Sequence, residues 1–352
     1  MPTAPFVPSS PPSSLLVAPF DAPSKGFLAF LRCETEQQCR NGHLGIVKNY
    51  GCAGRSLARF LATQGKRDVP FKKLTRLTMA DYEAWLQTRG LCKNTTSCYL
   101  RALQAVYNKA VRQGLTEDRH PFLGTYRGVA RTVKRAVGHE DIRRLQTLDV
   151  RMALVDSGLK PCGRRFDKLE KQLEFARDIF LFCFCCRGMT FVDFAYLRKA
   201  DISGGVISYV RRKTHLRMTV RVEPVMQQII DRHPSTTVYQ FPLLTVTDDA
   251  ERLYQQYHRT LGWYNTRLAM LGKMLGGITL TLYVCRHSWA TVAYQQHLPL
   301  SVISQSMGHD SEKTTEIYLK SLESSVIDAA NRYLIEQVLG QGKKKSKKRT
   351  AQ

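Results

Sequence analysis

The chain of 352 residues is strongly basic: 53 lysines and arginines stand against 29 aspartates and glutamates, giving a net charge of +24 and a pI near 9.8. This excess is spread along the whole chain and indicates a polyanionic partner, most simply nucleic acid. An acidic membrane surface is the competing interpretation, but no single amphipathic helix concentrates the charge. The longest apolar run, Ile179 to Cys186, is far shorter than the roughly 20 residues of a spanning helix, so we expect no transmembrane segment.

The first 23 residues are rich in proline and serine and lack the basic start of a signal peptide, so we expect a disordered leader. Cysteines are scattered through the rest of the chain. Cys183 and Cys186 have a CxxC spacing, but no second ligand pair follows at zinc-finger distance. Buried thiols in a reducing cytoplasm are favoured over a metal site. We expect a cytoplasmic, nucleoid-associated protein that needs neither a metal nor a cofactor.

Residues 24–123 show helical periodicity and few strand signals. A glycine ends each of three predicted helices, and Asn94 or Thr95 is the predicted cap of the third. The three helices are 50–65, 79–89 and 96–113. Basic side chains lie off the apolar face of the third, which is typical either of a small helical domain that binds DNA phosphates or of a solvated helix surface. The candidate phosphate contacts on this helix are Arg101, Lys109 and Arg112.

Between residues 124 and 137 the periodicity fades and positive charge increases, which predicts a basic linker between two domains. Its candidate DNA contacts are Arg127, Arg131, Lys134 and Arg135. A second domain then extends from residue 138 to 340, and a lysine-rich tail occupies 341–352. The predicted elements of the second domain include helices at 175–186, 249–274 and 282–296, and two strands at 206–210 and 218–222. A basic connection, 211–217, joins the two strands.

A basic and hydroxylic cluster lies near the C-terminus. It consists of Tyr283, Arg286, His287, Gly308, His309 and Tyr318. The cluster combines a guanidinium, two imidazoles and a late tyrosine, with no carboxylate placed to hold a metal. This combination suits the handling of a phosphate ester without Mg²⁺, with a phenol as nucleophile.

These residues resemble the C-terminal boxes of the tyrosine recombinase (phage integrase) family, in which His-x-x-Arg-His and Leu-Gly-His precede a tyrosine by nine residues. The corresponding segments here are Tyr283 to His287, Met307 to His309, and Tyr318. The chain looks most similar to the branch found in Bacteroidales-type bacteria, where a tyrosine often opens the first box. The resemblance implies a mainly α fold with a small antiparallel β-sheet. A helical core-binding (SAM-like) domain at 24–123 would be joined to a catalytic domain at 138–340.

The resemblance also implies roles for these residues. Tyr318 would be the nucleophile that forms a 3′-phosphotyrosyl intermediate; the alternative is a core tyrosine on an amphipathic helix. Arg286 would bind two nonbridging phosphate oxygens with its planar fork. His309 would act in acid–base catalysis or donate to the phosphate, with either protonation state accessible. Tyr283 would donate a hydrogen bond, because a phenol with a pKa of ~10 is no base at neutral pH. His287 would give structural support.

Two further catalytic candidates lie upstream. The family pattern Gly-Leu-Arg-Ile-Ser-Glu would put its arginine at Thr190 if Asp193 matches the glutamate. Arg187 is the substitute that we predict, one helical turn earlier on the same face; the alternative is an ion pair, with Asp193 as a candidate partner. Lys213 directly precedes a threonine, as the family's general acid usually does, and a solvated basic turn is the alternative. Its neighbours Arg211 and Arg212 are predicted phosphate contacts.

The resemblance implies a site-specific recombinase that binds inverted half-sites of double-stranded DNA as a dimer and pairs them in a tetramer. An apolar stripe at 324–339 predicts a C-terminal helix that links protomers, or else packs on its own domain. Two rivals remain: a catalytically silent DNA-binding protein and a type IB topoisomerase-like relaxing enzyme. The DNA sites decide between integration, excision and inversion as much as the protein does.

Overall fold

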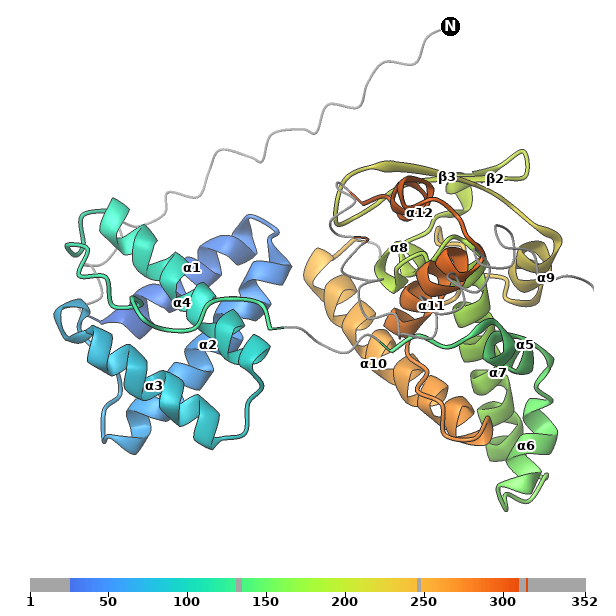
Figure 1. Cartoon of the computed structure of the whole chain (residues 1–352), viewed down its shortest axis with the longest axis horizontal. Helices are drawn as coiled ribbons and strands as arrows, with labels where there is room; N and C mark the ends of the chain where they lie inside the picture. The colour runs from blue at the N-terminus through green and yellow to red at the C-terminus, as the bar shows by residue number, and fades with distance from the viewer. Residues whose placement is uncertain (1–25, 131–134, 246–247, 310–314, 316–352) are drawn as a thin grey trace, which may run out of the picture. The chain divides into compact units, whose positions relative to one another are not determined.

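The computed structural model describes residues 26–130, 135–245, 248–309 and 315. The chain divides into two compact units, 1–131 and 132–352, each with a hydrophobic core of its own. The structure is mainly helical with one small antiparallel sheet (Figure 1). The predicted fold class is thereby confirmed. In the described part of the chain, no helix has the length and hydrophobicity that crossing a membrane requires.

Within its described residues, 26–130, the N-terminal unit has four helices that pack around leucines and aromatic rings. They are α1 (Phe27–Arg40), α2 (Leu44–Thr63), α3 (Arg76–Thr88) and α4 (Lys93–Arg112), with a short 3₁₀ turn η1 (Phe71–Lys73) before α3. The side chains of Leu57, Leu61, Leu100 and Leu103 are fully buried where α2 and α4 pack together. The three predicted helices are confirmed, and each begins earlier than predicted.

The predicted cap of α4 is wrong, and the reason is a contact distant in sequence. Cys92 takes the N-cap position, and Asn94 lies inside the helix. The Asn94 amide donates to the Ala130 carbonyl (2.9 Å) and its oxygen accepts from the Ala130 N–H (2.7 Å). The Ser97 hydroxyl donates to the Gly128 carbonyl (2.7 Å). Part of the segment predicted as a linker is therefore bound along the start of α4.

The C-terminal unit surrounds the long helix α7, against which α10 and α11 pack (Figure 1). Its helices are α5 (His139–Thr147), α6 (Val150–Asp156), α7 (Arg164–Cys185), α8 (Phe191–Ala195), α9 (Pro224–Arg232), α10 (Ala250–Met274), α11 (Leu282–Gln295) and α12 (Leu300–Met307), with a 3₁₀ turn η2 (Lys199–Asp201) after α8. Ile179, Phe180 and Phe182 of α7 are completely buried. Cys183 and Cys186 are buried as predicted, and burial raises the pKa of both thiols.

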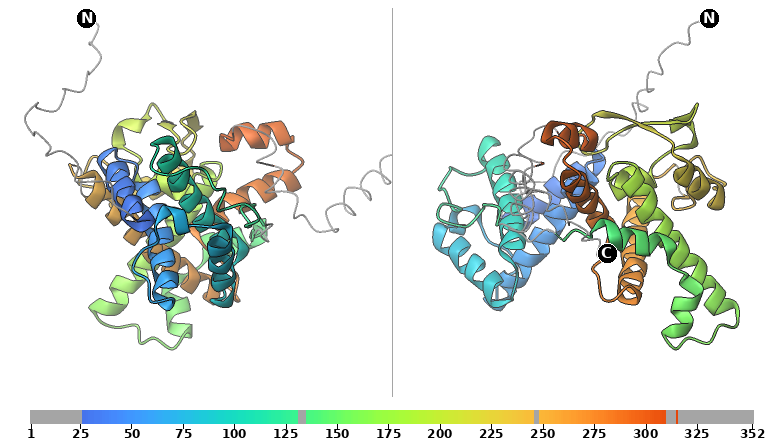
Figure 2. Two further views of the ribbon diagram at one scale, coloured as in Figure 1. Left: turned by 90° about the vertical axis from the view of Figure 1, so that its left-hand side faces the viewer. Right: turned by 45° about the vertical axis from the view of Figure 1, so that its right-hand side comes forward.

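The sheet has three strands in the order β1-β2-β3: β1 (Ile202–Ser203), β2 (Val206–Val210) and β3 (Arg217–Arg221). The β2–β3 pair runs from Val206 opposite Arg221 to Val210 opposite Arg217, within one residue of the prediction. The alternate residues Ile207, Tyr209, Met218 and Val220 are buried, which fixes the register of the pair. The turn of this hairpin lies beside α12 (Figure 1, Figure 2).

Candidate active site

Arg286 joins three separate segments of the C-terminal unit. It lies on the first turns of α11, where the Thr281 hydroxyl caps the helix by accepting from the Val284 N–H (3.1 Å). The residue is almost fully buried, at 3% exposure. Nη1 donates to the Gly188 carbonyl (2.8 Å), and Nη2 donates to the Met307 carbonyl (2.7 Å) and to Nε2 of His309 (2.8 Å). The predicted pair Arg286 and His309 is therefore in direct contact.

The contact with Arg286 fixes the tautomer of His309. A guanidinium can only donate, so Nε2 of His309 must accept and Nδ1 carries the proton. Nδ1 then donates to the hydroxyl of the buried Thr315 (2.7 Å). Burial, followed by the positive charges of Arg286, Arg211 and Lys213, lowers the pKa of His309 to about 3. His309 is thus neutral at physiological pH without DNA, whereas the sequence led us to expect that either state was accessible.

Gly308 is where the hairpin meets the end of α12. Its φ of 61° is in the left-handed region and ends the helix. A Cβ here would lie 2.7 Å from Sδ of Met218 and 2.9 Å from Cδ of Arg211, so any other residue would displace these side chains as well as strain the backbone. Its carbonyl accepts from Nη1 of Arg211 and from the Thr214 hydroxyl (3.5 Å). The hairpin turn is thereby held directly against His309.

Asp193 fastens the other side of the hairpin turn to α8. The carboxylate is buried and accepts from the Thr190 hydroxyl (2.6 Å) and the Arg212 N–H (2.9 Å). Its Oδ2 also lies 3.9 Å from Nε of Arg211, whose side chain is as buried as that of Arg286. The ion pair that we considered between Arg187 and Asp193 is absent; among the described residues, Arg211 is the cation beside this carboxylate.

The predicted geometry of Arg187 is wrong. Residues 186–190 form a turn between α7 and α8, and Arg187 has a φ of 58°. No helix therefore places Arg187 on one face with Thr190. Gly188, with a φ of 70°, brings this turn against α11, because a Cβ there would lie 3.1 Å from Cα of Arg286. Arg187 is half-buried next to this contact, with no hydrogen bond or ion pair to any residue that the structure describes.

The remaining catalytic candidates differ in how far they are exposed. Lys213 is exposed in the hairpin turn and close enough to depress the pKa of His309. Tyr283 is 55% exposed, and its ring packs edge-on against His287 with centroids 4.6 Å apart. His287 itself is buried, and its role in structural support stays a prediction. Tyr318 lies outside the described residues, as do the predicted C-terminal helix 324–339 and the tail.

Comparisons with known proteins show which proteins share this architecture. Residues 26–127 match the family model of the phage integrase SAM-like domain. The integrase of transposon Tn1549, in complex with a circular intermediate DNA, superposes with a TM-score of 0.57 over 88% of this chain and 100% of that chain, at 13% identity. The chain has the fold of the tyrosine recombinases. The resemblance carried by the sequence motifs is therefore confirmed for the fold, and for the N-terminal domain by the family model.

Two other tyrosine recombinase structures agree. A lambda integrase dimer bound to a COC′ core site has a TM-score of 0.56 and 13% identity, covering 82% of this chain and 94% of that chain. XerH recombinase in a post-cleavage complex with palindromic difH substrate has a TM-score of 0.55 and 14% identity, covering 88% and 95%. No curated protein matches this chain in sequence. The assignment to the Bacteroidales-type branch stays a prediction.

The predicted DNA contacts of the SAM-like domain differ in accessibility. Arg101 and Arg112 are exposed on α4. Lys109 forms an ion pair with Glu34 of α1 (2.7 Å) and lies over the Tyr50 ring, and its contact with DNA stays a prediction. Its ammonium is therefore used to join helices within the domain. Arg127 is half-buried and donates to the Gln104 side chain (2.6 Å).

The other predicted DNA contacts lie around the linker and the hairpin. Arg135 is exposed, whereas Arg131 and Lys134 lie outside the described residues. Arg212 is exposed, and its guanidinium stacks 4.0 Å from the centroid of the Tyr196 ring. This stacking holds the Arg212 side chain at the surface of the hairpin. Among the residues that the structure describes, no group of three His, Cys, Asp or Glu side chains could hold a metal ion.

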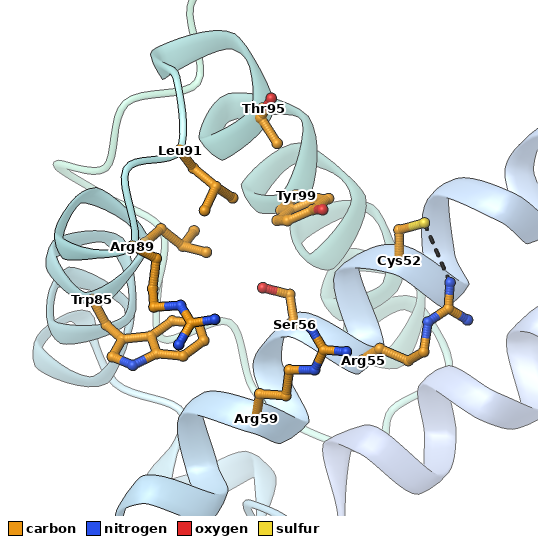
Figure 3. Close-up of a pocket in the computed structure, with 10 residues that line it drawn as sticks. Cys52, Arg55, Ser56, Arg59, Trp85, Arg89, Leu91, Thr95 and Tyr99 are labelled. Carbon is orange, nitrogen blue, oxygen red and sulfur yellow. Dashed lines mark hydrogen bonds between the residues drawn. The ribbon is translucent and has the colours of Figure 1, made fainter. Parts of the chain in front are cut away.

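The SAM-like domain also has a basic-aromatic pocket that the sequence did not reveal. It has a volume of about 320 Å³ and lies between α2, α3 and α4 (Figure 3). Three arginines line it together with an indole and a phenol: Arg55, Arg59, Arg89, Trp85 and Tyr99. The Arg89 guanidinium lies 5.6 Å from the centroid of the Trp85 ring. Periodicity within single helices could not predict this pocket, because three helices contribute to it.

Proposed function

We propose that this chain is a site-specific DNA recombinase that cleaves and rejoins DNA strands through a 3′-phosphotyrosyl intermediate on Tyr318. The observation that carries the proposal is the direct bond from buried Arg286 to neutral His309, nine residues before Tyr318. Preorganised cations directed at developing negative charge are usually the largest contribution to such catalysis. The fold, shared with recombinases and integrases solved on DNA, supports the same reaction class.

In the proposed cleavage step, the Tyr318 oxygen attacks the scissile phosphorus and the bond from phosphorus to O5′ breaks. The products are a 3′-phosphotyrosine and a 5′-hydroxyl, whose proton Lys213 supplies. The same step in reverse, with a 5′-hydroxyl of another strand as nucleophile, rejoins the DNA. Because each step exchanges one phosphoester for another, no external energy source is needed.

His309 has a defined part in this scheme. An incoming phosphate competes with Nε2 of His309 for the Nη2 protons of Arg286. Released Nε2 is unprotonated and can accept the phenolic proton of Tyr318. The negative phosphate also opposes the surrounding positive charge, which raises the pKa of His309 towards its ordinary value and makes it a better base.

We propose that both units bind DNA. In the SAM-like domain, Arg101, Arg112 and the basic-aromatic pocket would contact phosphates, and in the C-terminal unit Arg212 would do so. We further propose a dimer on inverted half-sites and a tetramer in the synapse, with the segment 324–339 linking protomers. The direction of recombination then depends on the arrangement of the sites.

Covalent trapping tests the proposed function. The protein is incubated with nicked fragments of genomic DNA from its source organism, and complexes that resist denaturation are recovered and sequenced. We expect adducts at a recurrent sequence, lost in Tyr318→Phe and kept in Tyr294→Phe, which alters an exposed tyrosine on α11. Adducts that persist in Tyr318→Phe would overturn the assignment of the nucleophile.

One observation favours a second candidate, a catalytically silent DNA-binding protein. Thr190 occupies the position at which the family pattern has an arginine, and its short hydroxyl is bonded to Asp193. For a silent protein, the same trapping experiment gives no covalent adduct with the wild-type chain, whereas a separate filter-binding measurement at low salt shows specific binding.

A further inference from the structure

We propose that Arg211 supplies the second guanidinium of the phosphate site, in the role that the family pattern assigns to an arginine at Thr190. This inference rests on the proposed recombinase function. Arg211 was predicted only as a phosphate contact in a basic turn. In the structure Arg211 is instead buried and, like Arg286, donates to a main-chain carbonyl just before His309.

The first argument is the symmetry of the two arginines around His309. Arg286 donates to the Met307 carbonyl and Arg211 donates to the Gly308 carbonyl, so consecutive peptide groups are bound by two different guanidiniums. Both residues are 3% exposed. They reach the site from α11 and from the hairpin, and His309 follows directly after the two carbonyls. A phosphate beside His309 would therefore be close to both guanidiniums.

The second argument is the incomplete pairing of Arg211. Its Nε is buried and has no hydrogen-bond partner among the described residues. The nearest carboxylate oxygen, Oδ2 of Asp193, is 3.9 Å away and already accepts from the Thr190 hydroxyl. A buried guanidinium N–H without an acceptor is costly, and an anionic oxygen would satisfy it. Beside Asp193, Arg211 thus keeps one buried N–H donor that a phosphate oxygen would satisfy.

The third argument is the comparison with Arg187. The charged groups that depress the pKa of His309 are Arg286, Arg211 and Lys213, and Arg187 is not among them. Arg187 lies in a left-handed turn, half-buried and outside the hydrogen-bond network around His309. The shortened side chain at Thr190 and the buried Arg211 share Asp193 as a partner. The guanidinium is thereby supplied from the hairpin instead of from α8.

The test uses the charge of the scissile phosphate. Two nicked duplexes carry the sequence recovered by trapping, one with the normal phosphodiester and one with a methylphosphonate at the scissile position. The methylphosphonate has one nonbridging oxygen fewer and no charge, so it needs a second guanidinium much less. Adduct formation by wild type, Arg211→Ala, Arg211→Lys and Arg187→Ala is measured on both duplexes. Arg221→Ala is the control, because Arg221 is an exposed arginine at the end of the same hairpin.

We expect Arg211→Ala to slow adduct formation on the phosphodiester by about 10²–10³-fold, the usual effect of removing one donor to a transition-state oxyanion. On the methylphosphonate we expect a loss of no more than about tenfold, because the stabilised charge is already absent. Arg211→Lys should lie between these values, since it keeps the charge but not the fork. The ratio of the two rates for one preparation does not depend on how much of the variant is folded.

Two results would overturn the inference while leaving the recombinase proposal in place. One is an equal loss on both duplexes in Arg211→Ala, which would indicate a purely structural role. The other is a selective loss on the phosphodiester in Arg187→Ala but not in Arg211→Ala, which would assign the second guanidinium to Arg187. If the wild-type chain forms no adduct on any nicked duplex, the proposed function and this inference are both wrong.

Discussion

The arginines of the two units are held in opposite ways. In the SAM-like domain, Arg59 and Arg89 line an open pocket with aromatic neighbours, and their charges are accessible to a partner. In the C-terminal unit, Arg286 and Arg211 are buried and bonded to main-chain carbonyls. Accessible charges contribute affinity that salt screens, whereas buried and oriented charges act on one fixed point. The same residue type is thus suited to binding in one unit and to chemistry in the other.

The largest effect is expected at Arg286. Arg286→Ala should slow adduct formation by about 10³-fold or more, because one side chain supplies several oriented donors. DNA affinity should change much less, since the other proposed phosphate contacts lie elsewhere. Adduct rates and fluorescence anisotropy of labelled duplex measure the two quantities. Equal losses of cleavage and affinity would remove the distinction between the units.

The next effect is the loss of stability when a glycine with positive φ is replaced by alanine in each unit. Gly308→Ala should lower the free energy of unfolding by about 2–4 kcal/mol, because a Cβ would meet Met218 and Arg211 in a left-handed backbone. Gly65→Ala is the matched control: its φ is also positive, but no atom lies within 4 Å of the added Cβ. There we expect only the backbone cost, about 1 kcal/mol. Equal losses in urea unfolding of the two variants would contradict the packing that we describe at Gly308.

A smaller effect should appear in the dependence of stability on pH. The folded-state pKa of His309 lies at about 3, below the ordinary value of 6.5, so between these values the unfolded chain binds the proton and the folded chain does not. The contribution of His309 to the free energy of unfolding is therefore fully present above pH 6.5 and is lost as the pH falls towards 3. Wild type should therefore lose more stability than His309→Gln between pH 7 and pH 5, measured by urea unfolding. Parallel losses would mean that His309 titrates normally.

The smallest effect is expected in the basic-aromatic pocket. Arg59→Ala and Arg89→Ala should each weaken DNA binding by only a few-fold and reduce the salt slope of log Kd by about 1. Adduct formation at saturating DNA should not change. Lys48→Ala, an exposed cation elsewhere on α2, is the control with an unchanged salt slope. If the salt slopes of the pocket variants stay at the wild-type value, the basic-aromatic pocket does not contact phosphates.

Sequence periodicity predicted those elements whose burial pattern is local. The hairpin strands were predicted within one residue because alternate side chains are buried. The two-residue strand β1 is too short to show any alternation. The cap of α4 was missed because the Asn94 amide is bonded to Ala130, far along the chain.

The residues of the candidate site likewise divide into those that a local motif predicts and those that depend on contacts distant in sequence. Arg286 and His309 could be predicted because both lie in motifs with fixed spacing. The burial of Arg211 could not, because it depends on the contact with Gly308, 97 positions away. Arg187 was misplaced because positive φ values at 187 and 188 end α7 there, where we had assumed a continuous helix. The Thr315 partner of His309 has no periodic signal and becomes apparent only from the hydrogen bond in the structure.

The most direct test of the central claim is to identify the residue bound to DNA. The trapped adduct is digested with a nuclease and trypsin, and the peptide that retains nucleotide is sequenced by mass spectrometry. We predict the peptide 314–320, with Tyr318 linked to a 3′-phosphate. A linkage to any other side chain, or to a 5′-phosphate, would contradict the proposed mechanism.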